Sequence, residues 1–262
     1  AAGAGLSVQY LGMNNNWINN TFREVISRAL NYSFIITELL EDQAVRLKSP
    51  VPNGIQYAND GFAAATFDVA AARALMQGMG YGVGFTTDQE WIDVAEGTSP
   101  FFSWNYTYNI GNDMRENMFA LLTDNLAMVG IAVEDAGTTW QNFIYSLYEV
   151  AGRHRNMVEL YWLGWIPDYN DASNYINPLF TNRSIASNGA VYNGWQSAID
   201  NNRDPTVLMD NVQLLMEAAL LETVPAQRTI YYDRIQELLV EEDMPWAYGY
   251  TGINNDAWNK DV

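Results

Sequence analysis

Apolar positions along this chain follow two different spacings, and their alternation predicts strands separated by helices. Residues 8–13 form a short, mainly apolar run that is typical of a strand. Apolar side chains after Asn20 recur every three or four residues to about Asn31, as on one face of a helix. Residues 158–165 form a second apolar run, interrupted by Glu159, and predict a mostly buried strand. Strands that alternate with helices in this way indicate an α/β layer architecture.

The remaining elements are predicted from the same spacings together with caps, prolines and glycines. Pro50 and Pro52 exclude a helix from residues 49–54, so this segment is expected to be an ordered loop. Asp68 is the expected N-cap of the third helix. Further helices are predicted over residues 34–40, 69–80, 113–128, 140–148, 172–179, 205–222 and 225–242, and further strands over residues 101–108, 131–134 and 245–250.

The segment after the second apolar run is the most informative part of the chain. Trp165 ends the predicted strand, and it is followed by Pro167, Asp168, Asn170 and Asp171, residue types that end strands and build turns. An indole and a carboxylate are therefore expected together at the tip of a rigid strand. By residue type alone, Asp168 is expected to cap the turn or the helix that follows, and its alternative role is a ligand contact. Trp165 is either a wall of the same site or a core aromatic.

The charge balance excludes one large class of partners. The chain has 13 lysines and arginines against 31 aspartates and glutamates, for a net charge of −18 and a pI near 4.2. Nucleic-acid binding needs a basic surface, so we expect no nucleic-acid partner. Such acidity instead favours a soluble protein that functions outside the cell or in a salty medium. There is no cysteine in the sequence, hence no disulfide framework and no thiolate metal site.

Residues that would carry catalysis or hold a metal do not fall in the required patterns. His154 is the single histidine, which argues against a zinc site or a Ser-His-Asp triad. The carboxylates of residues 241–243 and those of Asp88 and Glu90 are interpreted as a solvated helix end and a loop, not as a glycosidase pair. The sequence contains no glycine-rich phosphate loop and no nucleophile elbow. We therefore expect no enzymatic activity, no cofactor and no metal.

The segment from residue 164 to residue 174 resembles the signature of a known family. The signature GW-x-x-DY-x-(D/E)-x-x-N is that of the family 5 extracellular solute-binding proteins, the peptide-binding subunits of ABC importers; it is matched here by Gly164, Trp165, Asp168, Tyr169, Asp171 and Asn174. Other segments resemble the family in its own order over nearly the whole chain: residues 22–40, 49–54, 67–81, 121–133 with Trp140 and Phe143, and 232–246. The resemblance implies an α/β fold of the periplasmic-binding-protein-like type II lobe, with a mixed sheet flanked by helices.

Full-length proteins with this signature have two lobes, and this chain resembles chiefly the second. Residues 1–262 are expected to form mainly the C-terminal lobe, with residues 1–15 and 245–262 near the hinge to a missing first lobe. No secretory signal precedes Ala1, so a mature or trimmed chain is expected. No apolar run is long enough to span a bilayer, and membrane association is expected only through an anchor absent from this chain.

The resemblance also implies roles for five residues. Asp168 would pair with the terminal ammonium of a bound peptide, and Trp165 would line the pocket beside it. Ile166 would pair with the main chain of the ligand in the manner of an added strand, and Tyr169 belongs to the same set of contacts. Arg153 would receive the peptide carboxylate, with a solvated turn as the alternative reading of its basic cluster.

These expectations combine into one predicted function with several alternatives. We predict an extracellular or periplasmic, cell-surface-associated component of an ABC transporter, a monomer that captures peptides by hinge closure and delivers them to permease subunits. An oligosaccharide or a nickel complex is the alternative ligand within the family, and the many tryptophans and tyrosines favour a sugar. A scaffold module and a secreted hydrolase are the alternatives from other classes. A scaffold would show a fully buried Trp165 and an Asp168 turned toward backbone donors.

Overall fold

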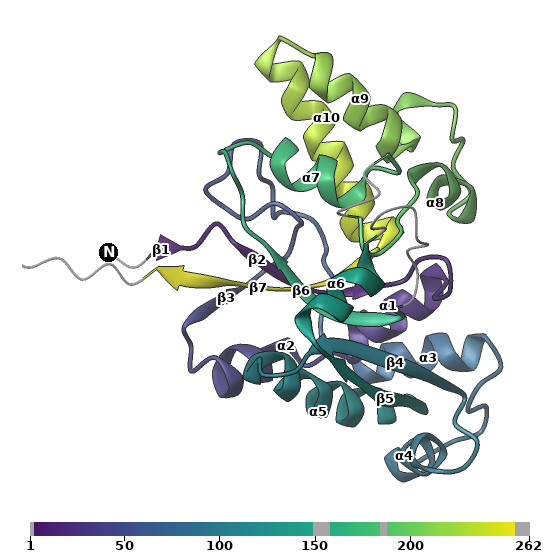
Figure 1. Ribbon diagram of the computed structural model, residues 1–262. Helices are drawn as coiled ribbons and strands as arrows, with labels where there is room; N and C mark the ends of the chain where they lie inside the picture. Colours follow the sequence, from purple (N-terminus) through teal and green to yellow (C-terminus); the bar gives the residue numbers. More distant parts are fainter. Residues whose placement is uncertain (1–2, 149–157, 184–187, 255–262) are drawn as a thin grey trace, which may run out of the picture.

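The predicted strands assemble into a mixed β-sheet with helices on both faces, as Figure 1 shows, which confirms the predicted α/β class. The computed structural model describes residues 3–148, 158–183 and 188–254. Within these ranges the strands are β1 (Gly3–Ala4), β2 (Val8–Met13), β3 (Ala44–Arg46), β4 (Phe102–Asn109), β5 (Ile131–Thr138), β6 (Leu160–Trp165) and β7 (Trp246–Asn254). Their order in the sheet is β1-β7-β2-β6-β4-β5, and β3 also pairs with β7.

The sheet is antiparallel on one side and parallel on the other. β2 pairs antiparallel with both β6 and β7, and β1 and β3 pair antiparallel with β7. β4 runs parallel to both β5 and β6. The carboxyl ends of β4, β5 and β6 therefore meet at one edge of the sheet, which is where open α/β sheets place their ligands.

Helices connect the strands and cover the two faces of the sheet. They are α1 (Asn20–Ala29), α2 (Tyr32–Phe34), η1 (Ile35–Leu39), α3 (Val69–Gly78), α4 (Asp88–Glu96), α5 (Asp113–Ala127), α6 (Trp140–Leu147), α7 (Ser173–Phe180), α8 (Gly194–Asp200), η2 (Leu208–Asp210), α9 (Val212–Leu221), α10 (Pro225–Glu237) and η3 (Leu238–Asp243). The predicted cap of α3 is confirmed, since the Asp68 carboxylate accepts a hydrogen bond from the Ala71 N–H at 2.9 Å.

Two predictions about local structure are wrong, and polar side chains explain both. The helix predicted from residue 205 begins at Val212 as α9, because Asn211 supplies its cap. Asp88 and Glu90 lie in helix α4 instead of a loop, since Thr87 and Glu90 form a reciprocal capping box at its start. In addition, β3 and α8 correspond to no predicted element.

Alternate side chains of the central strands enter two separate hydrophobic cores, one on each face of the sheet. On β6, Tyr161 and Leu163 enter the first core, whereas Leu160 and Trp162 enter the second. The first core contains side chains of α6, α7, α9 and α10, and the second contains side chains of α1, α3, α4 and α5. Figure 1 shows α7, α9 and α10 above the sheet and α1, α3, α4 and α5 below it.

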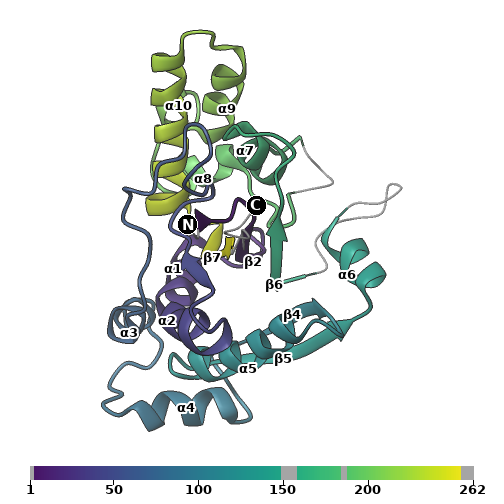
Figure 2. The same ribbon diagram turned by 90° about the vertical axis from the view of Figure 1, so that its left-hand side faces the viewer.

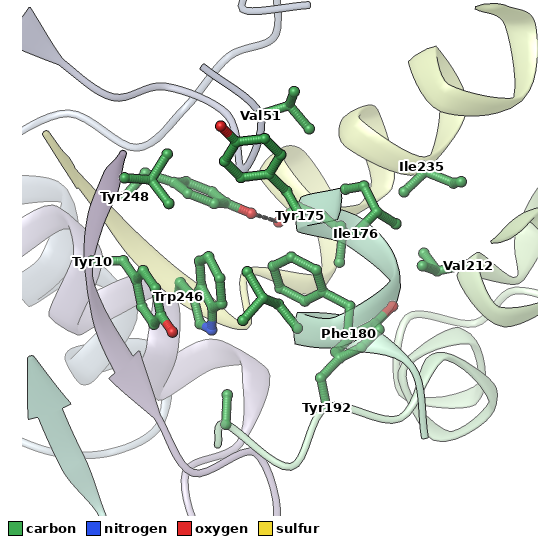
Figure 3. Close-up of a cluster of buried hydrophobic side chains, with 14 of the residues drawn as sticks. Tyr10, Val51, Tyr175, Ile176, Phe180, Tyr192, Val212, Ile235, Trp246 and Tyr248 are labelled. Atoms are coloured by element: carbon green, nitrogen blue, oxygen red, sulfur yellow. Dashed lines mark hydrogen bonds between the residues drawn. The ribbon is translucent and has the colours of Figure 1, made fainter. Parts of the chain in front are cut away.

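Aromatic stacking fixes the first core against the sheet, as Figure 3 shows. The rings of Tyr10 on β2 and Trp246 on β7 stack with their centroids 3.4 Å apart, and Phe180 of α7 packs on Trp246 at 4.4 Å. The Tyr248 hydroxyl donates a hydrogen bond to the Leu239 carbonyl at 3.0 Å, which ties β7 to η3. Helix α7, which directly follows the signature turn, is therefore held on a rigid platform.

The carboxylates of residues 241–243 do not form a simple solvated helix end, and that prediction is wrong for Asp243. Its side chain is fully buried, and its carboxylate accepts hydrogen bonds from the Tyr192 hydroxyl, the Arg203 guanidinium and, at 3.1 Å, the Asn201 amide. Burial raises the pKa of Asp243 to about 6, although the Arg203 charge and the Tyr192 hydrogen bond oppose the rise.

This buried carboxyl group leads us to expect a pH-dependent stability. The folded state keeps the proton on Asp243 up to about pH 6, whereas an unfolded chain loses it near the ordinary pKa of 3.8. The folded state thus binds more protons between these values, so the free energy of unfolding should fall as the pH rises from about 4 to about 6, by at most about 3 kcal/mol. Urea denaturation at several pH values measures this fall. Asp243→Asn should lack this component, and equal pH slopes in both proteins would contradict the assignment.

Candidate ligand-binding site

The candidate site begins where β6 ends. β6 pairs with β2 along its whole length, and the register Val8↔Trp165 is the last pair. A Cβ atom on Gly164 would meet the Gln9 side-chain amide and lie 2.7 Å from the Val8 carbonyl oxygen. The signature glycine is therefore required by the close approach of β2, and it fixes the strand that carries Trp165.

Trp165 is partly buried and is held by the helix that follows. Its ring packs against the first core, and its Nε1–H donates a hydrogen bond to Asn174 Oδ1 at 3.3 Å. The Asn174 amide in turn donates to the Tyr169 carbonyl at 3.3 Å. The signature asparagine thus orients the indole and the turn together, and Trp165 is neither a fully buried core residue nor a freely exposed one.

Asp171, the second acid of the signature, has a structural role. Its carboxylate receives two hydrogen bonds from Arg228, at 2.8 and 3.0 Å, and a third from the Ser173 N–H at 2.9 Å. The Arg228 guanidinium lies 4.9 Å from the Tyr57 ring centre and 5.2 Å from that of Tyr232. Burial lowers the pKa of Arg228, but the hydrogen bonds to Asp171 and Tyr57 outweigh it and raise the pKa above its usual range. The Asp171 carboxylate therefore stabilises the fold and is not free to bind a ligand.

Asp168, the first acid of the signature, is exposed and has no hydrogen bond or ion pair with any residue in the described ranges. It does not cap α7, because the N-cap position of that helix is Ala172 and no side chain caps it. Ile166 beside it is 76 % exposed, and Tyr169 is 55 % exposed with its hydroxyl 3.1 Å from Ser173 Oγ. The turn therefore presents a free carboxylate between two exposed apolar side chains.

β2 pairs with one edge of β6, and the opposite edge has few strand partners beside this turn. Among the described strands only β4 pairs with that edge, at Leu160 and Tyr161. Figure 2 shows β6 turned steeply relative to the β4–β5 pair. From Trp162 onward no described strand pairs with this edge of β6, so its backbone groups are candidates for hydrogen bonds to an extended ligand.

Further side chains lie just after the carboxyl ends of β4 and β5, on the side of the sheet where β6 also ends. Ile110 follows β4 and is 63 % exposed, and Trp140 follows β5 and is 53 % exposed. Arg115 lies in the first turn of α5, and its guanidinium is 5.5 Å from the Trp140 ring centre and 5.6 Å from that of Phe143. This edge therefore carries an aromatic surface and a cation in addition to Asp168.

Among the arginines of the described chain, Arg115 alone is held neither by a carboxylate nor by several backbone carbonyls. Six of them pair with a carboxylate, and Arg23 and Arg46 are held by several backbone carbonyls. Arg115 donates one hydrogen bond, to Asn109 Oδ1, and pairs with no carboxylate in the described ranges. Burial lowers the pKa of Arg115, while Tyr106 opposes the shift. Such an arginine is suited to receive a carboxylate from outside the chain.

The structure brings Trp165, Ile166, Asp168 and Tyr169 together at one turn, whereas the predicted Arg153 lies outside the described residues. Arg115 and Trp140 were not predicted from the sequence as site residues. The available signal is their position, just after the strands predicted over residues 101–108 and 131–134. Side chains after parallel strands meet at one edge, so these two residues are expected near the end of β6.

The described part of the chain offers neither a metal site nor a membrane span. There, no cluster of three or more histidine, cysteine, aspartate or glutamate side chains has the arrangement of a metal site. None of the helices in those ranges has the length and apolarity needed to cross a bilayer.

The sequence matches one family model over most of its length. The model describes the bacterial extracellular solute-binding proteins, family 5 Middle, and it matches residues 1–187, a range that includes the signature turn. The chain is also 23 % identical over 246 residues to heme-binding protein A of Haemophilus influenzae, an alignment that covers 92 % of this chain and 39 % of that protein.

Solved structures share the fold. HbpA2 from Haemophilus parasuis superposes with a TM-score of 0.76 at 17 % identity. The dipeptide-binding protein from Pseudoalteromonas sp. SM9913, in complex with Met-Leu, gives 0.72 at 20 % identity, and the oligopeptide-binding protein AppA from Bacillus subtilis, in complex with a nonapeptide, gives 0.72 at 17 %. Each likeness covers 97 % of this chain but only 44 to 46 % of the solved one. The chain thus spans less than half the length of these relatives.

Proposed function

Because the chain belongs to family 5 of the bacterial extracellular solute-binding proteins, we propose that it forms the C-terminal lobe of a protein that captures short peptides for an ABC importer. The observation that carries the proposal is the exposed Asp168 carboxylate, which has no partner among the described residues and stands at the tip of the strand that holds Trp165. A free carboxylate beside an indole suits the terminal ammonium of a peptide.

The ligand would make three kinds of contact with this lobe. Its ammonium group would pair with Asp168, and its main chain would extend along the open edge of β6 near Ile166. Its carboxylate would reach Arg115, whose planar guanidinium matches a carboxylate in two parallel hydrogen bonds. Main-chain and terminal contacts of this kind recognise a peptide independently of its sequence. Trp140, Trp165 and Tyr169 would line the space for its side chains.

Hinge closure would complete the site. β1 pairs with the far end of β7, so the segments expected near a hinge, within residues 1–15 and 245–262, lie side by side where they are described. A first lobe joined there would close over the ligand, and the ligand would stabilise the closed state by contacting both lobes. The closed protein, outside the cell or in the periplasm, would then deliver the peptide to the permease subunits at the cell surface.

Ligand retention tests the proposal directly. The protein at its natural length is purified without unfolding, and mass spectrometry identifies small molecules released on denaturation. We expect a set of short peptides with free amino termini, and calorimetric titration with the same synthetic peptides should give saturable binding. Repeated recovery of another solute class, with no binding of peptides, would overturn the proposal.

Replacing Arg115 tests the contact with the ligand carboxylate. Arg115→Gln should weaken the binding of peptides with a free carboxyl terminus about tenfold or more, because one charge-assisted pair is lost. Binding of the same peptides with an amidated carboxyl terminus should change little. Arg28→Gln is the matched control, since Arg28 lies on α1 and is already paired with Glu24. Equal losses for the free and the amidated peptides would contradict this role.

Heme is a second candidate ligand. A relative named heme-binding protein A aligns with 92 % of this chain, and the exposed Ile166, Tyr169 and Trp140 offer apolar contacts to a planar ligand. Titration of heme into the protein, followed by its absorption spectrum, separates the two ligands: saturable binding that short peptides do not compete would favour heme. Parallel titration with chito-oligosaccharides tests the sugar alternative that the exposed aromatic side chains favour.

A further inference from the structure

A hollow lies away from the proposed ligand site, between helices α4 and α5 and the edge strand β5. Its volume is about 470 Å³. Most of its lining comes from Ile92 and Ala95 of α4, Ala127 of α5, Met128 directly after it, and residues 131–134 of β5. The lining lies at the amino-terminal half of β5, whereas the proposed ligand site lies at the carboxyl ends of the parallel strands. We call this hollow the β5 groove, and Figure 1 shows α4, α5 and β5 near one another in the lower part of the view.

The β5 groove runs along the edge of the strand. Four consecutive residues of β5, from Ile131 to Glu134, line it, although their side chains alternate between the two faces of the sheet. A hollow that contacts side chains on both faces of the sheet must run along the edge of the strand. Among the described strands β5 pairs only with β4, so the N–H and C=O groups on its outer edge have no strand partner there. Such an edge is a template for an added strand.

Three carboxylates form the rim of the groove. Glu96, Asp124 and Glu134 line it and are exposed, and none of them pairs with a cation of the described chain. Glu134 accepts a hydrogen bond from the Ser103 hydroxyl at 3.1 Å. Arg73 of α3 is a cation next to the groove: it donates to the Met128 carbonyl at 2.7 Å and forms its ion pair with Asp88, not with a rim carboxylate.

We propose that the β5 groove binds a basic, extended segment of a partner protein as an added strand. The open strand edge would supply main-chain hydrogen bonds, and the apolar floor around Ala95, Ala127 and Ile131 would take alternate apolar side chains. The basic side chains between them would meet the three rim carboxylates, and this complementarity selects a cationic segment over an acidic one. The proposal stands on a different surface from the peptide site and does not depend on it.

A designed peptide tests this docking site. The probe is a fluorescent peptide of about nine residues that alternates lysine and valine, acetylated and amidated so that its termini carry no charge for Asp168 or Arg115. Fluorescence anisotropy should show saturable binding to the full chain, which weakens as salt is added. The same peptide with glutamate in place of lysine should not bind. Hydrogen exchange should slow at the backbone amides of β5 when the lysine peptide is bound.

Charge-reversal variants locate the binding. The triple variant E96K/D124K/E134K should weaken binding of the lysine peptide about tenfold or more. The control triple variant E38K/E41K/D60K, which changes the net charge equally at exposed positions elsewhere, should bind within about twofold of the wild type. Circular dichroism confirms that both variants are folded. Equal weakening in the two variants, binding of a peptide methylated at alternate backbone nitrogens as tight as the original, or unchanged exchange in β5 would overturn the proposal.

Discussion

Replacing Asp168 by asparagine is expected to abolish most peptide binding while leaving the fold intact. The substitution keeps the shape of the side chain and removes the charge that would pair with the ligand ammonium. A charge-assisted contact in a site closed to water contributes about 2 to 3 kcal/mol, which corresponds to a loss of about 30- to 150-fold in affinity. Isothermal titration calorimetry with a short peptide on the protein at its natural length measures this loss.

The stability of the Asp168→Asn variant provides the control for this prediction. Asp168 has no hydrogen bond or ion pair within the described chain, so the free energy of unfolding should change by less than about 0.5 kcal/mol. An unchanged affinity would remove Asp168 from the site. A marked loss of stability would instead point to a structural contact and would contradict the description of Asp168 as a free carboxylate.

Asp171→Asn, the same substitution three residues later, should instead destabilise the fold. Asp171→Asn leaves the Arg228 guanidinium, which lies beside the Tyr57 and Tyr232 rings, without its charged partner, and it weakens two hydrogen bonds of 2.8 and 3.0 Å. Removing one member of such a partly buried pair should lower the free energy of unfolding by about 3 kcal/mol. Urea denaturation followed by circular dichroism measures the change.

Two further variants show whether the pair itself is the cause. The double variant Asp171→Asn/Arg228→Met no longer has the unpaired charge of Arg228, so it should be more stable than Asp171→Asn. Glu24→Gln breaks the half-exposed pair with Arg28 and should cost less than about 1 kcal/mol. If Asp171→Asn costs no more than Glu24→Gln, the Asp171–Arg228 pair does not hold the signature turn.

Local signals in the sequence were sufficient for most elements of the fold. β2 has the predicted bounds, and Asp68 and Thr139 cap the helices for which they are the natural N-cap residues. The start of α4 also has a local signal, because Thr87 and Glu90 have the spacing of a capping box, although we predicted a loop there. The start of α9 is harder to predict, since Asp204 resembles a cap but folds back on Thr206, with its carboxylate 2.9 Å from the Thr206 nitrogen.

The site required contacts that no local pattern contains. Sequence reasoning places Asp168 and Asp171 in one turn but cannot tell which of them is free, because the partner of Asp171 is Arg228 on α10. Arg115 precedes the signature by about fifty residues, and only the parallel arrangement of β4 and β6 brings it to the same edge. In the same way, Asp243 belongs to an acidic run that looks solvated, and its burial results from packing against Tyr192 and Arg203.

The central claim is that the carboxylate at the tip of β6 binds the ammonium group of a ligand, and one cycle of four affinities tests it most directly. A peptide with a free amino terminus and its N-acetylated form are each titrated into the wild-type protein and into Asp168→Asn. We expect acetylation to weaken binding to the wild type by about the same factor as the substitution, and to cause little further loss in the variant. The claim would be contradicted if acetylation weakened binding to Asp168→Asn by the same factor as it weakens binding to the wild type. It would also be contradicted if the acetylated peptide bound the wild type as tightly as the free peptide.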